Sequence, residues 1–238
     1  MKLLEEMSWP QIVAGLKETQ TVILPVGATE EHGPHLPTMT DTIQAVEVAR
    51  SVAKGRHVFL APPLHYGVCR STRGFPGTIT VGHDALRAFA RDLLLSFADS
   101  GFARVLILTG HAGGQHMAAL EEACQMAVEE RDFCVSLVSL FDLIDAGAVE
   151  TPHDGHAGEM ETSLMMNIRP DLVKGRPEKH FPKRPRFLVM KDVRSLMGNG
   201  VMGNPQPATL EKGKQFFQMA VTGVMGALDE LESDVWKK

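Results

Sequence analysis

Four runs of consecutive apolar residues recur along the chain, and a segment with helical spacing follows most of them. The runs cover residues 21–27, 57–64, 104–110 and 133–140. Unbroken apolar character over such a short length is typical of strands that are buried on both faces, as in a parallel sheet. Glycine or proline ends the first three runs, which is a further sign of a strand that stops at a turn. We therefore predict four buried strands.

Helical spacing is clearest in two segments, residues 40–55 and 82–101. Apolar side chains of the first lie on one broad face and Gly55 provides a stop signal, while the second is long and amphipathic. Further helices are predicted over 114–132, 158–168 and 209–238. Alternating strands and helices indicate one α/β domain over residues 1–238 with a mainly parallel sheet. The proline-rich segment 170–210 is expected to be irregular, and the long connection 65–80 to be functional.

Composition excludes several classes of protein. The chain is 44% hydrophobic and 22% charged, with a net charge of −5, so a nucleic-acid or anionic-membrane partner is not expected. The basic segment Lys179–Arg186 is interpreted as a solvated loop. The three cysteines form no CxxC pair, which favours a reducing compartment. Without a signal peptide or a long apolar span, the sequence predicts a cytoplasmic protein that spans no membrane.

Polar clusters follow three of the predicted strands. They read GATEEHGPHLPTMTD after the first run, TGHAGGQ after the third and HDGHAGEMETS after the fourth. Ligands of open α/β sheets bind beyond the carboxyl ends of the strands, so we expect these clusters to converge at one edge.

The first cluster offers the ligand types of a transition-metal site. Glu30 and His32 are two residues apart, and in an extended chain they point to the same side. Asp41 follows at the start of the next helix, where capping that helix is an alternative role. Carboxylate oxygen together with imidazole nitrogen suits Zn²⁺, Mn²⁺ or Fe²⁺.

The other two clusters add His111, His156 and Glu161. A Gly pair at 113 and 114 opens the helix after His111, but no phosphate-loop lysine follows it, so a nucleotide site is not expected. We interpret His116, on that helix, as structural. Several acids and imidazoles from separate loops thus predict a metal site at the sheet edge.

Taken together, these motifs resemble the creatininase (creatinine amidohydrolase) family. GATEEHGPHLPTMTD, GFPGTIT, TGHAGGQ, HAGEMETS and GNPQPATLEKG occur in the family's order and span residues 27–213. The resemblance implies a three-layer α/β/α sandwich, a dinuclear metal site with two divalent ions per chain, and a homo-oligomer, often a hexamer built from dimers. It implies that His156 is the catalytic histidine. It also implies five metal ligands, namely Glu30, His32, Asp41, His111 and Glu161.

Three departures from the family pattern bear on the substrate. Gly113 stands where creatininase has a glutamate ligand, which makes Glu161 the expected fifth ligand. Trp9 and Trp236 lie near the chain ends, away from the His156 loop where creatininase has substrate-closing tryptophans. Arg70 and Arg73 occupy a loop that contains a histidine in many relatives, and a guanidinium there suits a carboxylate or phosphate.

The sequence therefore predicts a metal-dependent hydrolase of a C–N bond in a small cyclic amide, a formamide or a related small molecule. Expected substrate contacts are His35, Arg73 and the backbone of Gly113 and Gly114, with His35 alternatively orienting a ligand. Alternatives are ring opening of a keto-inositol or lactone, cleavage of a peptide, and a non-catalytic metal-stabilised oligomer.

Overall fold

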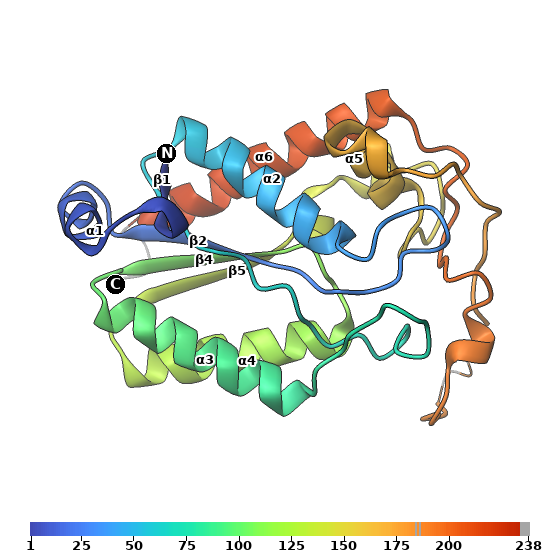
Figure 1. Ribbon diagram of the computed structural model, residues 1–238, viewed down its shortest axis with the longest axis horizontal. Coiled ribbons are helices and arrows are strands. Elements are labelled where there is room, and N and C mark those ends of the chain that lie inside the picture. The colour runs from blue at the N-terminus through green and yellow to red at the C-terminus, as the bar shows by residue number, and fades with distance from the viewer. Residues whose placement is uncertain (184, 186, 234–238) are drawn as a thin grey trace.

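A parallel β-sheet lies at the centre of the computed structural model, which describes residues 1–183, 185 and 187–233 (Figure 1). Over these residues the sheet has five strands in the order β1-β3-β2-β4-β5, and every neighbouring pair is parallel. The strands are β1 (Lys2–Leu3), β2 (Thr21–Val26), β3 (Phe59–Leu60), β4 (Arg104–Thr109) and β5 (Cys134–Ser139).

Helices cover both faces of the sheet and make three layers (Figure 1). One layer contains α2 (Thr40–Gly55), α5 (Glu159–Ile168) and α6 (Leu210–Glu232), and the other contains α3 (His83–Asp99) and α4 (Gly114–Glu130). Helix α1 (Trp9–Leu16) lies near the N-terminal end of the sheet. Short 3₁₀ turns occupy Leu4–Glu6, Leu140–Leu143, Ala146–Ala148, Pro170–Leu172 and Arg194–Leu196. The predicted α/β/α sandwich is confirmed.

Alternation along the strands divides the core between the two helical layers. In β2, Ile23 packs with the cluster under α2 and α6, whereas Val22 and Leu24 pack with the cluster over α3 and α4. In β4, Leu106 and Ile107 divide in the same way. Because both faces are buried, the strands carry unbroken apolar runs, and this explains the pattern in the sequence.

Most predicted elements are present, with differences at their bounds. The run 57–64 gives only the two-residue strand β3, because Pro62 and Pro63 have no amide hydrogen to donate to the sheet; Leu64 pairs with Val26 again as an isolated bridge. Strand β1 and helix α1 had not been predicted. The C-terminal helix ends at Glu232. The prediction extended it over residues 234–238, which include Trp236 and lie outside the described residues. Two arginines of the basic segment also lie outside them. Across the part of the chain that the structure describes, no helix is both long and apolar enough to span a bilayer.

The N-terminus of α2 lies directly against the carboxyl ends of β2 and β4, and glycine allows this approach. A Cβ atom at Gly110 would lie 2.1 Å from the backbone oxygen of Asp41, and one at Gly27 would lie 2.5 Å from the backbone nitrogen of Thr42. Contacts this short exclude any side chain at either position. The two glycines thereby place Asp41 at the sheet edge.

Replacing Gly110 with alanine is expected to lower the free energy of unfolding by about 2–3 kcal/mol, because backbone must move to admit the methyl group. Urea unfolding measures this loss. Gly226→Ala is the matched control, since a Cβ there meets no atom within 4 Å and alanine favours its helix by up to ~1 kcal/mol. Equal stability of Gly110→Ala and the wild type would contradict the close approach.

Candidate metal centre

Asp41 lies between two histidines in the first turn of α2. Its Oδ1 is 2.8 Å from Nε2 of His32, and its Oδ2 is 3.2 Å from Nδ1 of His111. The side chain is only 1% exposed. One carboxylate oxygen therefore faces each imidazole, which is the arrangement expected of a carboxylate that bridges two metal ions.

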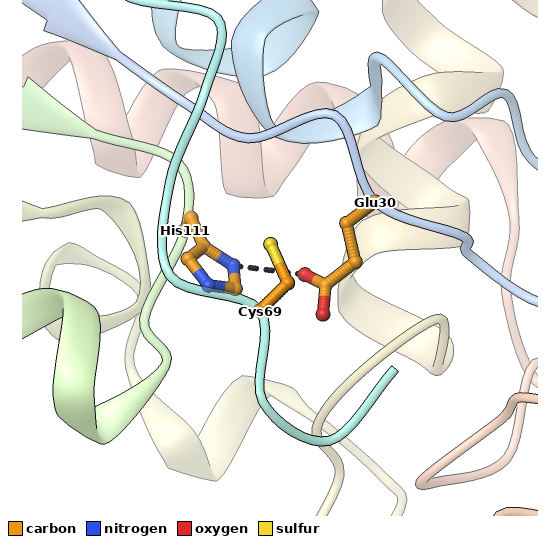
Figure 2. Close-up of side chains that lie close together, drawn as sticks. All are labelled: Glu30, Cys69 and His111. Atoms are coloured by element: carbon orange, nitrogen blue, oxygen red, sulfur yellow. Dashed lines mark ion pairs between the residues drawn. The ribbon is translucent and has the colours of Figure 1, made fainter. Parts of the chain in front are cut away.

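A further carboxylate lies on each side of this bridge. Glu30 Oε2 is 3.0 Å from Nδ1 of His111, the pair joined in Figure 2, and Glu161 Oε1 is 3.4 Å from Nε2 of His32. His32, Asp41 and Glu161 each offer one possible ligand atom, and these three atoms lie within 4.8 Å of one another. The loops after β2, β4 and β5 thus bring two groups of ligand atoms together, as expected from the sequence.

Backbone carbonyls fix which nitrogen each histidine turns toward the centre. His32 Nδ1 lies 3.0 Å from the carbonyl oxygen of Glu30, and His111 Nε2 lies 3.2 Å from that of Val68. A ring nitrogen that donates to a carbonyl carries the proton, so the other nitrogen presents its lone pair. Nε2 of His32 and Nδ1 of His111 are therefore the nitrogens available to a metal.

The lone pairs at this centre face one another. Among the described residues, Nε2 of His32, Oε2 of Glu30 and both carboxylate oxygens of Asp41 are buried without a hydrogen-bond partner. Buried acceptors that converge in this way need a cation between them. The mixture of carboxylate oxygen and imidazole nitrogen is that of Zn²⁺, Mn²⁺ or Fe²⁺ sites, so the residues fit the metal ions that the sequence predicted.

In the absence of a metal, protons supply this positive charge. Burial opposes protonation of His32, but Asp41 and Glu161 outweigh it and raise the pKa of His32 well above its usual range. Burial likewise opposes protonation of His111, and Glu30 and Asp41 raise its pKa well above the usual range. Burial alone would raise the pKa of Glu30, but the nearby histidines lower it to about 2. Metal ions and protons consequently compete for the same nitrogens.

His156 lies beside the two ligand groups. The centroid of its ring is 4.2 Å from that of the His32 ring, and its Nδ1 is 4.0 Å from Oε2 of Glu30. Its Nε2 is 2.5 Å from the carbonyl oxygen of Glu31, which holds the ring in one orientation. Burial and His32 oppose protonation, but Glu30, Glu31 and Glu161 outweigh them and raise the pKa of His156.

The turn that carries His156 has a strained backbone. Ala157 has φ of 53°, in the left-handed region that side chains other than glycine rarely adopt. Two contacts hold the turn: the Ala157 amide donates to Oε2 of Glu161, and the Met202 amide donates to the carbonyl of His156 at 2.7 Å. The structure thus orients His156 and Glu161 together.

The remaining predicted site residues take different positions. Gly113 lines the cavity at the centre, whereas Gly114 is exposed at the start of α4. His35 is buried, with Nε2 2.8 Å from Oγ1 of Thr162, and contacts the helix that carries Glu161. Arg73 donates to the carbonyl of Lys191 and does not line the cavity. His116 is fully buried against Thr109 and Val68, in accordance with a structural role.

Three neighbours of the centre were missed by the sequence analysis. Glu31 contacts His156 with Oε1 3.5 Å from its Nε2, Thr72 donates to Oε1 of Glu30, and Cys69 lies beside Glu30 and His111 (Figure 2). Cys69 and Thr72 belong to the connection 65–80, whose length was the only signal in the sequence that pointed to them.

A cavity of about 300 Å³ opens onto the centre. Its wall combines carboxylates, imidazoles, apolar side chains and one guanidinium: Glu30, Val68, Cys69, Arg70, Ser71, His111, Ala112, Gly113, Phe141, Gly155, His156, Glu161 and Met202. A volume near the low end of ligand pockets suits a small molecule, or one end of a larger one.

The chain matches a known family over almost its whole length. The model of the creatininase family, described as creatinine amidohydrolase, covers residues 5–228. This chain belongs to the creatininase family. It is 32% identical over 228 residues to the mycofactocin precursor peptide peptidase of Mycolicibacterium smegmatis, covering 90% of this chain and 86% of that relative. It is 28% identical over 251 residues to the creatinine amidohydrolase of Pseudomonas putida, covering 94% and 95%.

Solved creatininase structures share the fold. A tryptophan-to-phenylalanine mutant of creatininase superimposes with a TM-score of 0.88 at 26% identity, over 97% of this chain and 99% of that one. A glutamate-to-glutamine mutant described as of Zn-Zn type has a TM-score of 0.86 at 26% identity, over 97% and 98%. This creatininase-family protein is therefore a metal-dependent hydrolase that acts on amide bonds.

We expect metal binding to release about two or more protons per chain near neutral pH, because His32 and His111 must both give up the proton on the nitrogen that binds metal. In the folded, metal-free protein both pKa values are raised. Protonation therefore stabilises that state fully below about pH 6.5, and this stabilisation is lost as the pH rises through the raised values.

The difference in Tm between metal-loaded and metal-free protein should accordingly widen from about pH 6 to about pH 9. Differential scanning calorimetry measures the difference in Tm, and titration calorimetry in buffers of different ionisation enthalpy counts the protons. Metal uptake without proton release would contradict the competition between metal and protons.

Proposed function

We propose that the protein hydrolyses a C–N bond in a small cyclic amide, a formamide or a related compound at a centre of two divalent metal ions. The observation that carries this proposal is the position of the centre: its buried atoms without hydrogen-bond partners, among the described residues, lie next to a cavity of about 300 Å³ that Glu30, His111 and Glu161 line. A small molecule in this cavity can bring its scissile amide to the centre.

Glu30, Asp41 and His111 would hold one ion, and His32, Asp41 and Glu161 the other, with Asp41 shared. When bound, such ions activate a water molecule and polarise a carbonyl group. The ligand set accepts Zn²⁺, Mn²⁺ or Fe²⁺. This side chain chemistry is the same as that predicted from the sequence, and the contacts across Asp41 support the division into two groups.

We propose that His156 moves the proton. Its Nε2 is held by the Glu31 carbonyl, its Nδ1 lies 4.0 Å from Oε2 of Glu30, and the residue lines the cavity. Glu31 Oε2 accepts from the Gly33 amide at 2.8 Å, which fixes Glu31 behind the ring. In our proposal Nδ1 takes a proton near the centre and delivers it to the leaving nitrogen, the usual task of a general acid and base.

We propose that Arg70 selects a charged substrate. It is exposed and lines the cavity, whereas Arg73 is engaged by the carbonyl of Lys191. A guanidinium recognises a carboxylate or phosphate through paired hydrogen bonds. We therefore assign the reading of an anionic group on the substrate to Arg70 and not to Arg73.

A peptide substrate is the second candidate, and one observation favours it. A broader depression of about 720 Å³ adjoins the cavity through the shared residue Met202, and Pro152, His153, Phe181 and Pro182 complete its lining. An extended chain could follow this depression while one amide lies at the centre. The relative from Mycolicibacterium smegmatis is named as a peptidase of a precursor peptide, so its name also indicates a peptide substrate.

Metal content and substrate profiling test the proposal together. Protein purified without a metal-affinity tag is analysed by elemental mass spectrometry, then assayed against cyclic amides, N-formyl compounds and short peptides with and without a carboxylate. We expect about two transition-metal ions per chain and faster turnover of small carboxylated amides. Preference for peptides would select the second candidate, and absence of bound metal after reconstitution would overturn both.

A further inference from the structure

Cys69 lies inside the metal centre, although the metal-ligating motifs do not contain it. Its side chain is 1% exposed and lines the cavity. Three possible ligand atoms lie within 4.8 Å of one another: the Cys69 sulfur, one carboxylate oxygen of Glu30 and one ring nitrogen of His111. Figure 2 shows the thiol beside the line that joins the His111 nitrogen to the Glu30 carboxylate.

The backbone around Cys69 is fixed by three side chains. The Val68 amide donates to Nδ1 of His116 at 3.4 Å, and the Val68 carbonyl is 3.2 Å from Nε2 of His111. The Cys69 amide donates to Oγ1 of Thr80 at 2.9 Å. A side chain on so constrained a backbone is held in place before any ligand binds, which is what a metal ligand requires.

The carboxylates beside Cys69 have unused acceptor atoms. Oε1 of Glu30 accepts from Thr72, but Oε2 and both oxygens of Asp41 have no hydrogen-bond partner among the described residues. Oε2 of Glu30 and Oδ2 of Asp41 both lie close to Nδ1 of His111, at 3.0 and 3.2 Å. The Cys69 sulfur, an oxygen of Glu30 and a nitrogen of His111 thus form one group of possible ligand atoms, and Oδ2 of Asp41 adjoins this group at His111.

Position 113 cannot supply another ligand to this position. A Cβ atom at Gly113 would lie 2.7 Å from Nε2 of His111 and 3.3 Å from the carbonyl oxygen of Val68. Cys69, the residue that follows Val68, has its sulfur beside Glu30 and His111. Cys69 therefore offers a further ligand atom to the group around His111.

We propose that Cys69 binds, as a thiolate, the metal ion held by Glu30, Asp41 and His111, and that it makes this position selective for Zn²⁺ over Mn²⁺. The inference rests on the proposed two-metal centre. On binding, the S–H bond breaks, a sulfur–metal bond forms, and the proton passes to solvent. Thiolate ligands favour Zn²⁺ and Co²⁺, whereas Mn²⁺ prefers oxygen ligands.

The alternative is that Cys69 fills space as a small apolar side chain, since buried cysteines commonly do. The two roles differ in one spectroscopic property. A thiolate bound to Co²⁺ gives a charge-transfer absorption band in the near ultraviolet, whereas a buried thiol that touches no metal gives none. Co²⁺ is thus the probe, and full-length protein freed of metal is the sample.

We expect Co²⁺-loaded wild-type protein to show this band, Cys69→Ser to lose it while still binding Co²⁺, and Cys124→Ser, a partly buried position of α4 outside the cavity, to keep it. After dialysis against equal Zn²⁺ and Mn²⁺, elemental analysis should show the ratio of bound zinc to manganese about tenfold or more lower in Cys69→Ser than in wild type. Circular dichroism checks that each variant folds.

The wild-type spectrum decides the question even if Cys69→Ser fails to fold. About two bound Co²⁺ ions per chain without the near-ultraviolet band would overturn the role of Cys69 and leave the two-metal centre standing. No bound Co²⁺ would overturn both proposals. An unchanged zinc-to-manganese ratio in a folded Cys69→Ser variant that lacks the band would overturn the selectivity.

Discussion

Asp41→Asn is expected to lose metal from both positions and to lower amide hydrolysis about a thousandfold or more. Asp41 turns one oxygen toward His32 and the other toward His111, so in our proposal it belongs to both ligand groups. The amide of asparagine keeps the shape but removes the charge and turns a donor toward one histidine. Loss of metal activation is worth several kcal/mol, and about 4 kcal/mol corresponds to a thousandfold in rate.

The matched control is Asp171→Asn, which removes a carboxylate from an exposed pair with Arg169. It should keep full metal content and activity, because surface ion pairs contribute little. Elemental mass spectrometry and turnover of the best substrate are measured for both variants, with circular dichroism to confirm folding. If Asp41→Asn retained both ions, Asp41 would not be the bridging ligand. The alternative role of Asp41 as a helix cap is wrong, because Met39 is the N-cap of α2 and neither carboxylate oxygen of Asp41 accepts a hydrogen bond from the described residues.

His156→Gln is expected to slow hydrolysis by about 10²- to 10⁴-fold without changing the metal content. Nδ1 of His156 lies 4.0 Å from Oε2 of Glu30, while Nε2 is held by the Glu31 carbonyl. Glutamine retains a donor for that carbonyl but cannot exchange a proton near neutral pH. The loss should therefore appear in kcat, with little change in KM.

Metal content separates the two roles that the geometry allows His156. Glu30, His32 and His156 also form a group of possible ligand atoms within 4.8 Å, so a ligand role predicts loss of one ion in His156→Gln. Retention of both ions with slow turnover supports the proton-transfer role. His83→Gln, at the start of α3 and away from the cavity, is the control that should leave both measurements unchanged.

Much of the fold and of the candidate centre follows from local sequence. The apolar runs at β2, β4 and β5 predict strands buried on both faces, and the structure confirms this burial for β2 and β4. Strand β5 is present but lies at the sheet edge, and its first four residues are half-buried. The short strands β1 and β3 could not be predicted to this extent, because a two-residue strand exists only through its neighbours in the sheet. Side-chain alternation in Glu30 and His32, together with the shared edge of a parallel sheet, anticipated the convergence that the structure shows.

The sequence by itself determined the types of candidate ligand, their loops and the family, because these depend on short patterns of residues and on strand order. Only the tertiary structure decided that Cys69, Thr72 and Glu31 touch the centre and that Arg70, not Arg73, lines the cavity. The connection 65–80 has no helix or strand period to set its side-chain directions. Contacts with His116, Thr80 and His111, from distant parts of the chain or the far end of the same loop, set them instead.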